Sequence, residues 1–330
     1  MEINIRWGIL STANIAIESV IPAMLHSEYC SVTGIASRNI NKAKIIAKQF
    51  QISKYYGSYQ ELLDDKEMEA VYIPLPNHLH VKWAIKALKA GKHVLVEKPI
   101  AISSQEAKEL FEEAKKHPRL KIMEAFMYKF HPQWIRVKEL INNGEIGKLK
   151  TIQSSFSFFD DDPKSIVNNE EFGGGSLMDI GCYPISISRF LFDAEPKSVS
   201  ANIEYHPDFK VDILASVILE FEEGTSTFFS SIQMIDNQQV QIFGTKGSIK
   251  FEIPFNPPED QPVKIWLVKE EIKKEIEFEK CDQYSCQADM FSLAIMEHRK
   301  TPVSMEDAIN NMIVIEKIKE SARLGKKVIL

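Results

Sequence analysis

The chain contains 330 residues, of which 44% are hydrophobic and 26% are charged. This composition is ordinary for a folded globular protein and excludes a disordered or fibrous chain, and the length suits two domains better than one. A net charge of −6 gives no general attraction to nucleic acid or to an anionic membrane, so we expect neither as a partner.

The sequence shows no targeting or metal-binding pattern. The N-terminal run MEINIRWGIL carries charges, and no apolar stretch approaches the roughly 20 residues that span a bilayer. The cysteines are Cys30, Cys182, Cys281 and Cys286. They are few and scattered, unlike those of a secreted disulfide scaffold or a zinc site, and His78 and His80 are spaced as a poor chelate. We therefore expect a cytoplasmic protein without a bound metal.

The first 125 residues alternate between strand-like and helix-like segments. Residues 3–10 form a strand-like run that leads through a short turn into a helix-like segment. Further strands are expected at 30–37, within 65–74, at 93–96 and near 121–126, and helices at 41–50, 81–90 and 103–116, the last with Ser103 as its N-cap. Such alternation requires crossover connections, so residues 1–125 are predicted to form a doubly wound parallel sheet of the Rossmann type.

The remaining residues, 126–330, have a different pattern. From Lys148 the strands are longer and are joined by hairpin-like turns, as in 211–221, Glu222-Glu223-Gly224 and 225–234. Helices are expected at 176–192, near 283–298 and near 305–324. We predict an α+β domain with a mostly antiparallel open sheet and flanking helices, which would bind the substrate.

One predicted strand carries apolar residues on both faces. Val211, Ile213 and Ala215 alternate on one side of it, but Leu214 and Ile218 lie on the other. A sheet face that is still partly apolar is typical of a subunit contact. We expect a homodimer or homotetramer that forms through this sheet.

The turn after the first strand is a candidate site for a dinucleotide. Gly8 to Ala16 stand where a Rossmann fold carries G-x-G-x-x-G/A, although Ser11 and Ala13 replace two of the glycines. Small residues before a helix let the backbone approach a pyrophosphate, and the alternative is a plain turn without a ligand. The expected cofactor contacts here are Gly8, Ser11, Thr12, Ala13, Asn14 and Ile15.

The end of the second strand indicates which dinucleotide binds. An NAD-preferring domain presents a carboxylate here to the ribose 2′-hydroxyl, whereas this chain has Ser37, Arg38 and Asn39. A guanidinium pairs with a 2′-phosphate, and Lys42 adds a second positive charge. We expect NADP(H) rather than NAD(H), with an exposed arginine in a surface turn as the alternative interpretation.

Two further clusters carry residues that are suited to proton transfer. Glu97-Lys98-Pro99 follows the strand at 93–96, so Lys98 is expected at the sheet edge that faces a ligand. A glycine run, Gly173 to Gly175, precedes a helix with Asp179 and Tyr183 on one face. The glycines would allow loop movement or a close backbone approach, and the alternative is a flexible linker.

These motifs resemble those of the glucose-fructose oxidoreductase and inositol 2-dehydrogenase family (Gfo/Idh/MocA). The resemblance covers nearly the whole chain and rests on residues 97–99, 76–80, 124–133 and 173–184. The pair of Asp179 and Tyr183 resembles the branch of dimeric dihydrodiol dehydrogenases and NADP-dependent D-xylose 1-dehydrogenases. The chain departs from the family in the glycine loop, at the two replaced glycines.

The resemblance implies roles for individual residues. Lys98 and Tyr183 would transfer the proton, Asp179 would position a substrate hydroxyl, and Asn77 and His80 would lie near the nicotinamide ribose. Leu75, Glu97 and Lys98 are further expected cofactor contacts. Either Lys98 or Tyr183 could be the base. The implied activity is that of an NADP(H)-dependent oxidoreductase acting on a CH–OH group of a sugar (an aldose such as D-xylose), a polyol or a dihydrodiol.

Other functions are compatible with the same motifs. The chain could be a non-catalytic NADP(H)-binding sensor of the same fold, or a hydrolase or dehydratase that uses its cofactor transiently. Phe156, Phe158 and Phe159 could form the wall of a sugar site, with Phe159 as the expected substrate contact, although an aromatic stripe is also typical of a core.

Overall fold

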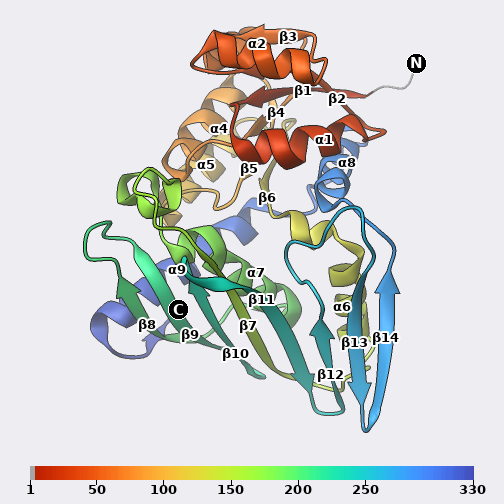
Figure 1. Cartoon of the computed structure of the whole chain (residues 1–330), viewed down its shortest axis with the longest axis vertical. Coiled ribbons are helices and arrows are strands. Elements are labelled where there is room, and N and C mark those ends of the chain that lie inside the picture. Colours follow the sequence, from red (N-terminus) through yellow and green to blue (C-terminus); the bar gives the residue numbers. More distant parts are fainter. Residues whose placement is uncertain (1–3) are drawn as a thin grey trace. The chain divides into compact units, whose positions relative to one another are not determined.

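The computed structural model describes residues 4–330, and they form two compact units (Figure 1). Unit 1 contains the chain up to Met127 together with Asp282–Ile309, and unit 2 contains Tyr128–Cys281 together with Asn310–Leu330. Within residues 4–330, no helix combines the length and the hydrophobicity that a membrane span requires.

Unit 1 is built on a six-stranded parallel sheet with the order β3-β2-β1-β4-β5-β6. Its strands are β1 (Ile5–Leu10), β2 (Cys30–Ala36), β3 (Lys54–Tyr56), β4 (Ala70–Ile73), β5 (His93–Glu97) and β6 (Ile122–Ala125). The strand expected at residues 3–10 begins at Ile5, and Ile3 lies outside the described residues. The order reverses between β1 and β4, so the predicted doubly wound Rossmann sheet is confirmed.

Unit 1 also contains helical segments, most of which connect these strands. They are the π-helical turn η1 (Ala16–Val20) continued by α1 (Ile21–Leu25), then α2 (Ile40–Gln49), α3 (Tyr59–Asp64), the 3₁₀ turn η2 (Asn77–Leu79), α4 (His80–Lys89), α5 (Ser104–Lys115) and α8 (Gln283–Met296). The expected N-cap of α5 is confirmed, because Ser103 Oγ accepts a hydrogen bond from Glu106 N at 3.2 Å.

Helix α8 belongs to unit 1 although the sequence pattern placed it in the second domain. Trp7 Nε1 donates a hydrogen bond to Ser292 Oγ at 3.2 Å, and the rings of Trp7 and Phe291 lie 5.7 Å apart. Cys30 Sγ lies 3.2 Å from the same Ser292 hydroxyl. Figure 1 shows α8, in blue, beside α1. Unit 1 is therefore completed by a segment more than 150 residues further along the chain.

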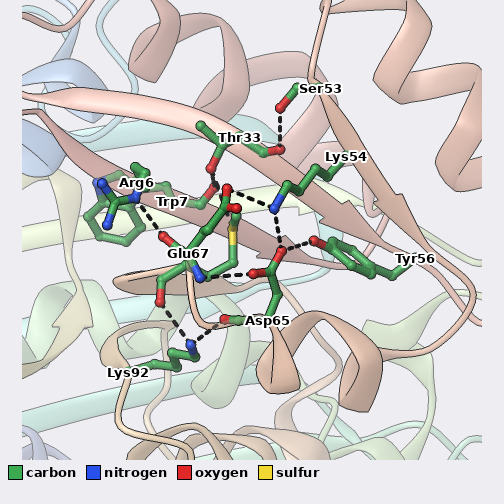
Figure 2. A network of polar contacts seen from close by, with 10 residues as sticks. Arg6, Trp7, Thr33, Ser53, Lys54, Tyr56, Asp65, Glu67 and Lys92 are labelled. Carbon is green, nitrogen blue, oxygen red and sulfur yellow. Dashed lines mark hydrogen bonds and ion pairs between the residues drawn. The ribbon is translucent and has the colours of Figure 1, made fainter.

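A polar network holds unit 1 together where β4 and β5 begin (Figure 2). Lys92 Nζ donates hydrogen bonds to the carbonyl oxygens of Asp65, at 2.6 Å, and Met68, at 2.8 Å. The Asp65 carboxylate accepts from Lys54 Nζ at 2.8 Å and from the Tyr56 hydroxyl. These two bonds, with the Lys54 bond the stronger cause, lower the pKa of Asp65 well below its usual range. Asp65 and Lys92 precede β4 and β5, away from the carboxyl ends of these strands, so we assign the network a structural role.

Unit 2 contains a nine-stranded sheet with the order β14-β13-β12-β11-β7-β10-β9-β8-β15. Its strands are β7 (Leu149–Phe159), β8 (Ser198–Tyr205), β9 (Asp212–Glu220), β10 (Thr225–Ser231), β11 (Gln233–Gly244), β12 (Gly247–Phe251), β13 (Val263–Lys269), β14 (Ile272–Phe278) and β15 (Val328–Ile329). All pairings are antiparallel except that of β10 with β7. The predicted mostly antiparallel sheet is confirmed, and β9 and β10 form the expected hairpin.

Helices of unit 2 cover one face of this sheet. The helical segments that remain are η3 (Met127–Phe130), α6 (Pro132–Asn142), η4 (Ile166–Asn168), η5 (Glu170–Phe172), the π-helical turn η6 (Leu177–Gly181) continued by α7 (Cys182–Phe192), and α9 (Met305–Leu324). The first residue of η3 and the first five residues of α9 belong to unit 1. Trp134 of α6 stacks on Phe251 at 4.2 Å, and Ser321 Oγ of α9 accepts a hydrogen bond from Ala201 N at 3.1 Å. The opposite face leaves Ile218 45% exposed.

Candidate active site

The structure brings most of the predicted cofactor residues of unit 1 to one edge of the sheet. Parallel strands end at the same edge, and the pairs Leu10 with Ala36 and Ile73 with Val96 fix this alignment. The segments that follow the strands contain Ser11, Thr12 and Ala13 after β1, Ser37 and Arg38 after β2, Leu75 and Asn77 after β4, and Lys98 after β5. In doubly wound sheets this carboxyl edge is where ligands bind.

The loop after β1 consists of three half-buried small residues, Ser11 to Ala13. Helical backbone begins at Asn14, two residues before η1, and the Ala13 carbonyl oxygen accepts hydrogen bonds from Ala16 N at 3.0 Å and Ile17 N at 3.2 Å. Asn14 is exposed and Ile15 is half-buried in the first turn. The first amides of this helix therefore face the sheet edge without a bulky side chain before them, which suits an anion.

Gly8 does not lie in this loop. It is a buried residue inside β1, and a Cβ atom built on it would lie 2.5 Å from Leu62 Cδ2. The absence of a side chain therefore lets α3 pack against the strand. The structure gives Gly8 a packing role, and the loop itself begins at Ser11.

The turn after β2 is ordered by its own side chains. Ser37 Oγ accepts a hydrogen bond from Asn39 N at 3.2 Å, and Asn39 Oδ1 caps α2 by accepting from Lys42 N at 3.4 Å. Arg38 and Lys42 are exposed, and no hydrogen bond or ion pair found among residues 4–330 involves the Arg38 guanidinium. A fixed turn that presents an uncommitted guanidinium is suited to a phosphate.

His80 is fully buried and joins two of the edge segments. Its Nδ1 lies 2.7 Å from the carbonyl oxygen of Pro99, and its Nε2 lies 2.6 Å from that of Leu75. Burial lowers the pKa of His80 to about 4. The neutral ring carries one N–H and donates to only one of these two carbonyl oxygens, but it packs between the segments that follow β4 and β5. Asn77 in η2 is half-buried.

The backbone at Lys98 is fixed by its neighbour Glu97. Glu97 Oε1 accepts a hydrogen bond from the Tyr72 hydroxyl of β4 at 2.5 Å, and Oε2 accepts from Lys98 N at 3.2 Å. Tyr284 of α8 also belongs to this region: burial raises its pKa to about 12, and the charge of Glu97 acts in the same direction. The sequence pattern gave no signal for Tyr284, because α8 was expected in the other domain.

Tyr183 of unit 2 lies in an aromatic cluster. Its ring centroid is 5.3 Å from Phe255, 5.6 Å from Phe156 and 5.8 Å from Tyr128. Tyr183 is only 4% exposed, and the Tyr128 hydroxyl donates a hydrogen bond to Ser186 Oγ, one turn further along α7, at 2.8 Å. These contacts fix the Tyr183 ring in a largely apolar setting.

Asp179 lies one turn before Tyr183, in η6, and is half-exposed. Its backbone N donates a hydrogen bond to the Gly175 carbonyl oxygen at 3.0 Å. A Cβ atom on Gly174 would lie 2.5 Å from the Val167 carbonyl oxygen. Gly174 is thus packed closely against neighbouring backbone, which favours the close backbone approach over the flexible linker as the reason for a glycine at this position.

The structure does not bring Phe159 to Tyr183. Phe159 is 61% exposed at the end of β7, whereas Phe156 is buried against the Tyr183 ring. Residues at an odd separation on a strand point to opposite faces, so Phe156 and Phe159 cannot share one wall. Phe156, which the sequence pattern did not separate from its neighbours, is the aromatic residue of β7 in this cluster.

Comparisons with known proteins agree with this architecture. The model of the oxidoreductase family with an NAD-binding Rossmann fold matches residues 5–126, and that of the GFO/IDH/MocA C-terminal domain matches residues 134–250. A dinucleotide-binding oxidoreductase fold is thus the class that sequence and structure define. The chain belongs to the Gfo/Idh/MocA oxidoreductase family, as the resemblance of its motifs predicted.

Individual relatives cover nearly the whole chain. An uncharacterized oxidoreductase of Rhizobium meliloti is 43% identical over 327 residues, 97% of this chain and 98% of the relative. The D-xylose 1-dehydrogenase (NADP(+)) 2 of Haloferax volcanii is 35% identical over 324 residues, 98% of each chain. Among solved structures, a 3-ketoreductase from Actinomadura kijaniata in complex with NADP and TDP-benzene is 27% identical with a TM-score of 0.90, covering 96% of this chain and 98% of that one.

Proposed function

We propose that the protein is an NADP(H)-dependent dehydrogenase or reductase that moves a hydride between nicotinamide and a CH–OH or carbonyl carbon of a sugar, a polyol or a dihydrodiol. The observation that carries the proposal is the position of Lys98, directly after β5 at the carboxyl edge of a doubly wound sheet. An aldose such as D-xylose is the first substrate to test, because a D-xylose dehydrogenase is similar over nearly the whole chain.

The residues at the sheet edge fit a dinucleotide with a 2′-phosphate. The small loop from Ser11 to Ala13 leaves the first helix amides open to a pyrophosphate, and the helix dipole favours its charge. Arg38 and Lys42 offer two exposed cations where an NAD-binding domain would offer a carboxylate. When bound, the nicotinamide supplies or accepts the hydride. The NADP found in the A. kijaniata reductase structure supports this choice of cofactor.

In the proposed reaction, Lys98 Nζ and the Tyr183 hydroxyl hold and move the proton of the substrate hydroxyl. Oxidation of an alcohol needs a proton acceptor at the hydroxyl, and reduction of a carbonyl needs a donor at the same atom. Phe156 and Phe255 keep the Tyr183 ring in one orientation and exclude water from it. Asp179, one turn away on the same helix, accepts a hydrogen bond from a second substrate hydroxyl and so orients the sugar.

One experiment tests cofactor and substrate together. Absorbance of the reduced nicotinamide is followed across pentoses, hexoses, anhydrosugars and dihydrodiols, with NAD and with NADP. We expect turnover with NADP and at least one aldose, and Lys98→Met should abolish it while NADPH still binds. Retained turnover in Lys98→Met would refute the role of Lys98. NADPH binding without turnover of any compound would instead favour the non-catalytic sensor.

We further propose that two or more copies associate through the open face of the unit 2 sheet. A shallow hollow of about 660 Å³ over its central strands is lined by uncharged residues, among them Gln153, Ser216, Ile218 and Phe229. Interface centres are depleted in charge in this way. Ile218→Arg should therefore shift the mass measured by light scattering toward the monomer. Ile272→Arg, at an exposed position on the outermost strand β14, is the matched control.

A further inference from the structure

The turn that precedes Asp179 and Tyr183 is held by a carboxylate from a distant strand. Asp212, the first residue of β9, accepts two hydrogen bonds at the same oxygen, Oδ2: one from Leu177 N at 2.6 Å and one from Ser176 Oγ at 2.9 Å. The Ser176 side chain makes no capping hydrogen bond of its own to η6. Asp212 thus supplies, from 36 positions further along the chain, the cap that helices usually obtain from their own N-cap residue.

The carboxylate of Asp212 is buried and closely packed. Asp212 is 2% exposed, and a Cβ atom on Gly175 would lie 2.3 Å from its Oδ1. Ser230 Oγ of β10 lies 3.1 Å from Ser176 Oγ, and a Cβ atom on Gly181 would lie 2.9 Å from that same Ser230 hydroxyl. The start of the helix therefore packs closely on β9 and β10, because Gly175 and Gly181 have no side chain there and the Asp212 carboxylate accepts its hydrogen bonds.

The sheet fixes the position of Asp212. Strand β9 pairs with β8 on one side and with β10 on the other, so Asp212 starts an interior strand. Burial raises the pKa of Asp212, and the charge of Lys319 and the hydrogen bond from Leu177 N act against that rise. Burying a carboxyl group costs free energy unless it accepts hydrogen bonds, and Leu177 N and Ser176 Oγ donate these bonds to Asp212.

We propose that Asp212 is a positioning residue for the reaction, which holds Asp179 and Tyr183 in their working geometry by clamping the start of their helix. The inference rests on the proposed function of those two residues. The connection is short, because Asp179 N donates a hydrogen bond to the Gly175 carbonyl oxygen at 3.0 Å. The loop that Asp212 holds and Asp179 therefore belong to one helical turn. Displacement of reacting groups by about 1 Å can cost a hundredfold in rate.

The test compares Asp212→Ala with Asp212→Asn. Alanine removes the acceptor, whereas the asparagine carbonyl oxygen can still accept from both donors. With NADP and D-xylose as the probe pair, we expect Asp212→Ala to lower kcat at least tenfold with an unchanged KM for NADP, because the predicted dinucleotide residues belong to unit 1. Asp212→Asn should restore kcat to within about threefold of the unmodified protein. Asp208→Asn, an exposed carboxylate four residues earlier, is the control.

Hydrogen exchange measures the clamp independently of turnover. In Asp212→Ala the backbone amides from Leu177 to Tyr183 should exchange at least tenfold faster, with those of unit 1 unchanged. Ser176→Ala, which removes one donor and keeps the carboxylate, should give a smaller change and covers the case in which Asp212→Ala fails to fold. If the unmodified protein turns over no probe, the proposed function fails, and the exchange data still decide whether Asp212 holds the helix.

Two results would overturn the proposal. One is unchanged exchange in the segment from Leu177 to Tyr183 when the cap is removed. The other is an Asp212→Ala protein with a lower melting temperature but an unchanged kcat when assayed well below it, because that pattern belongs to a residue that serves stability alone.

Discussion

Lys92 Nζ lies 2.6 Å from the carbonyl oxygen of Asp65, and the lysine side chain is almost wholly buried, with the residue 2% exposed. It also donates to the Met68 carbonyl oxygen (Figure 2). Lys92→Met removes the donor from both carbonyl oxygens in a buried setting. We therefore expect the free energy of unfolding, measured in urea, to fall by about 1–3 kcal/mol. Lys89→Met, which removes a lysine from an exposed position on α4, is the control and should change the free energy of unfolding by less than about 0.5 kcal/mol. Equal losses in the two variants would contradict a role for these hydrogen bonds.

Stability should fall in mild acid partly because of His131. This residue is 1% exposed, and its Nδ1 caps α6 by accepting a hydrogen bond from Gln133 N at 3.2 Å. Burial lowers the pKa of His131 from 6.5 to about 4. Between these values the unfolded chain binds more protons than the folded one, so stability is present above pH 6.5 and is lost as the pH falls toward 4.

The matched variant is His131→Asn, because asparagine keeps a capping oxygen and does not titrate. When the pH is lowered from 7 to 5, the free energy of unfolding should fall by about 2 kcal/mol more for the unmodified protein than for this variant. The figure follows from a loss of about 1.4 kcal/mol for each pH unit below 6.5. His131→Ala lacks the cap and should be less stable at every pH. Chemical unfolding at a series of pH values measures all three, and parallel curves for the unmodified protein and His131→Asn would disprove the assignment to His131.

Local sequence patterns predicted the doubly wound sheet and the position of Lys98, because strand alternation and strand ends are local features. They did not predict which unit α8 would join. That choice depends on contacts such as Trp7 Nε1 with Ser292 Oγ, which link residues 285 positions apart and leave no mark on the helix pattern itself.

Local sequence patterns also could not predict which strand face is buried or which role a residue of the site has. Gly8 fits the spacing of a phosphate loop, but its contact with Leu62 shows that packing against α3 explains the glycine. Phe156 and Phe159 were equivalent in the sequence because β7 carries aromatic residues on both faces, and only the sheet decides which face is covered. Asp212 gave no signal at all, since its hydrogen-bond partners Ser176 and Leu177 belong to a distant segment.

Arg38 should determine the preference between the two nicotinamide dinucleotides. Its guanidinium is exposed beside the capped turn of α2 and would form charge-assisted hydrogen bonds with a 2′-phosphate. Loss of such bonds costs about 1.5–3 kcal/mol, so Arg38→Ala should raise the KM for NADP about ten- to hundredfold and leave that for NAD within twofold. Lys48→Ala, which removes an exposed charge at the far end of α2, is the control. Equal increases for NADP and NAD would show that Arg38 does not contact the 2′-phosphate.

Gly175→Ala should be damaging for two separable reasons. The residue has a φ of +104°, which costs a non-glycine residue about 1–3 kcal/mol, and its new Cβ atom would lie 2.3 Å from Asp212 Oδ1. Gly144→Ala isolates the first cost, because Gly144 has a φ of +73° and no atom within 4 Å of the added carbon. We expect Gly144→Ala to lower the melting temperature by a few degrees without changing kcat.

Gly175→Ala should be less stable still and should also lower kcat at least tenfold, since the methyl group must push the Asp212 carboxylate away from Ser176 and Leu177. A Gly175→Ala protein with full kcat would show that the loop accommodates the methyl group without moving Asp179 and Tyr183.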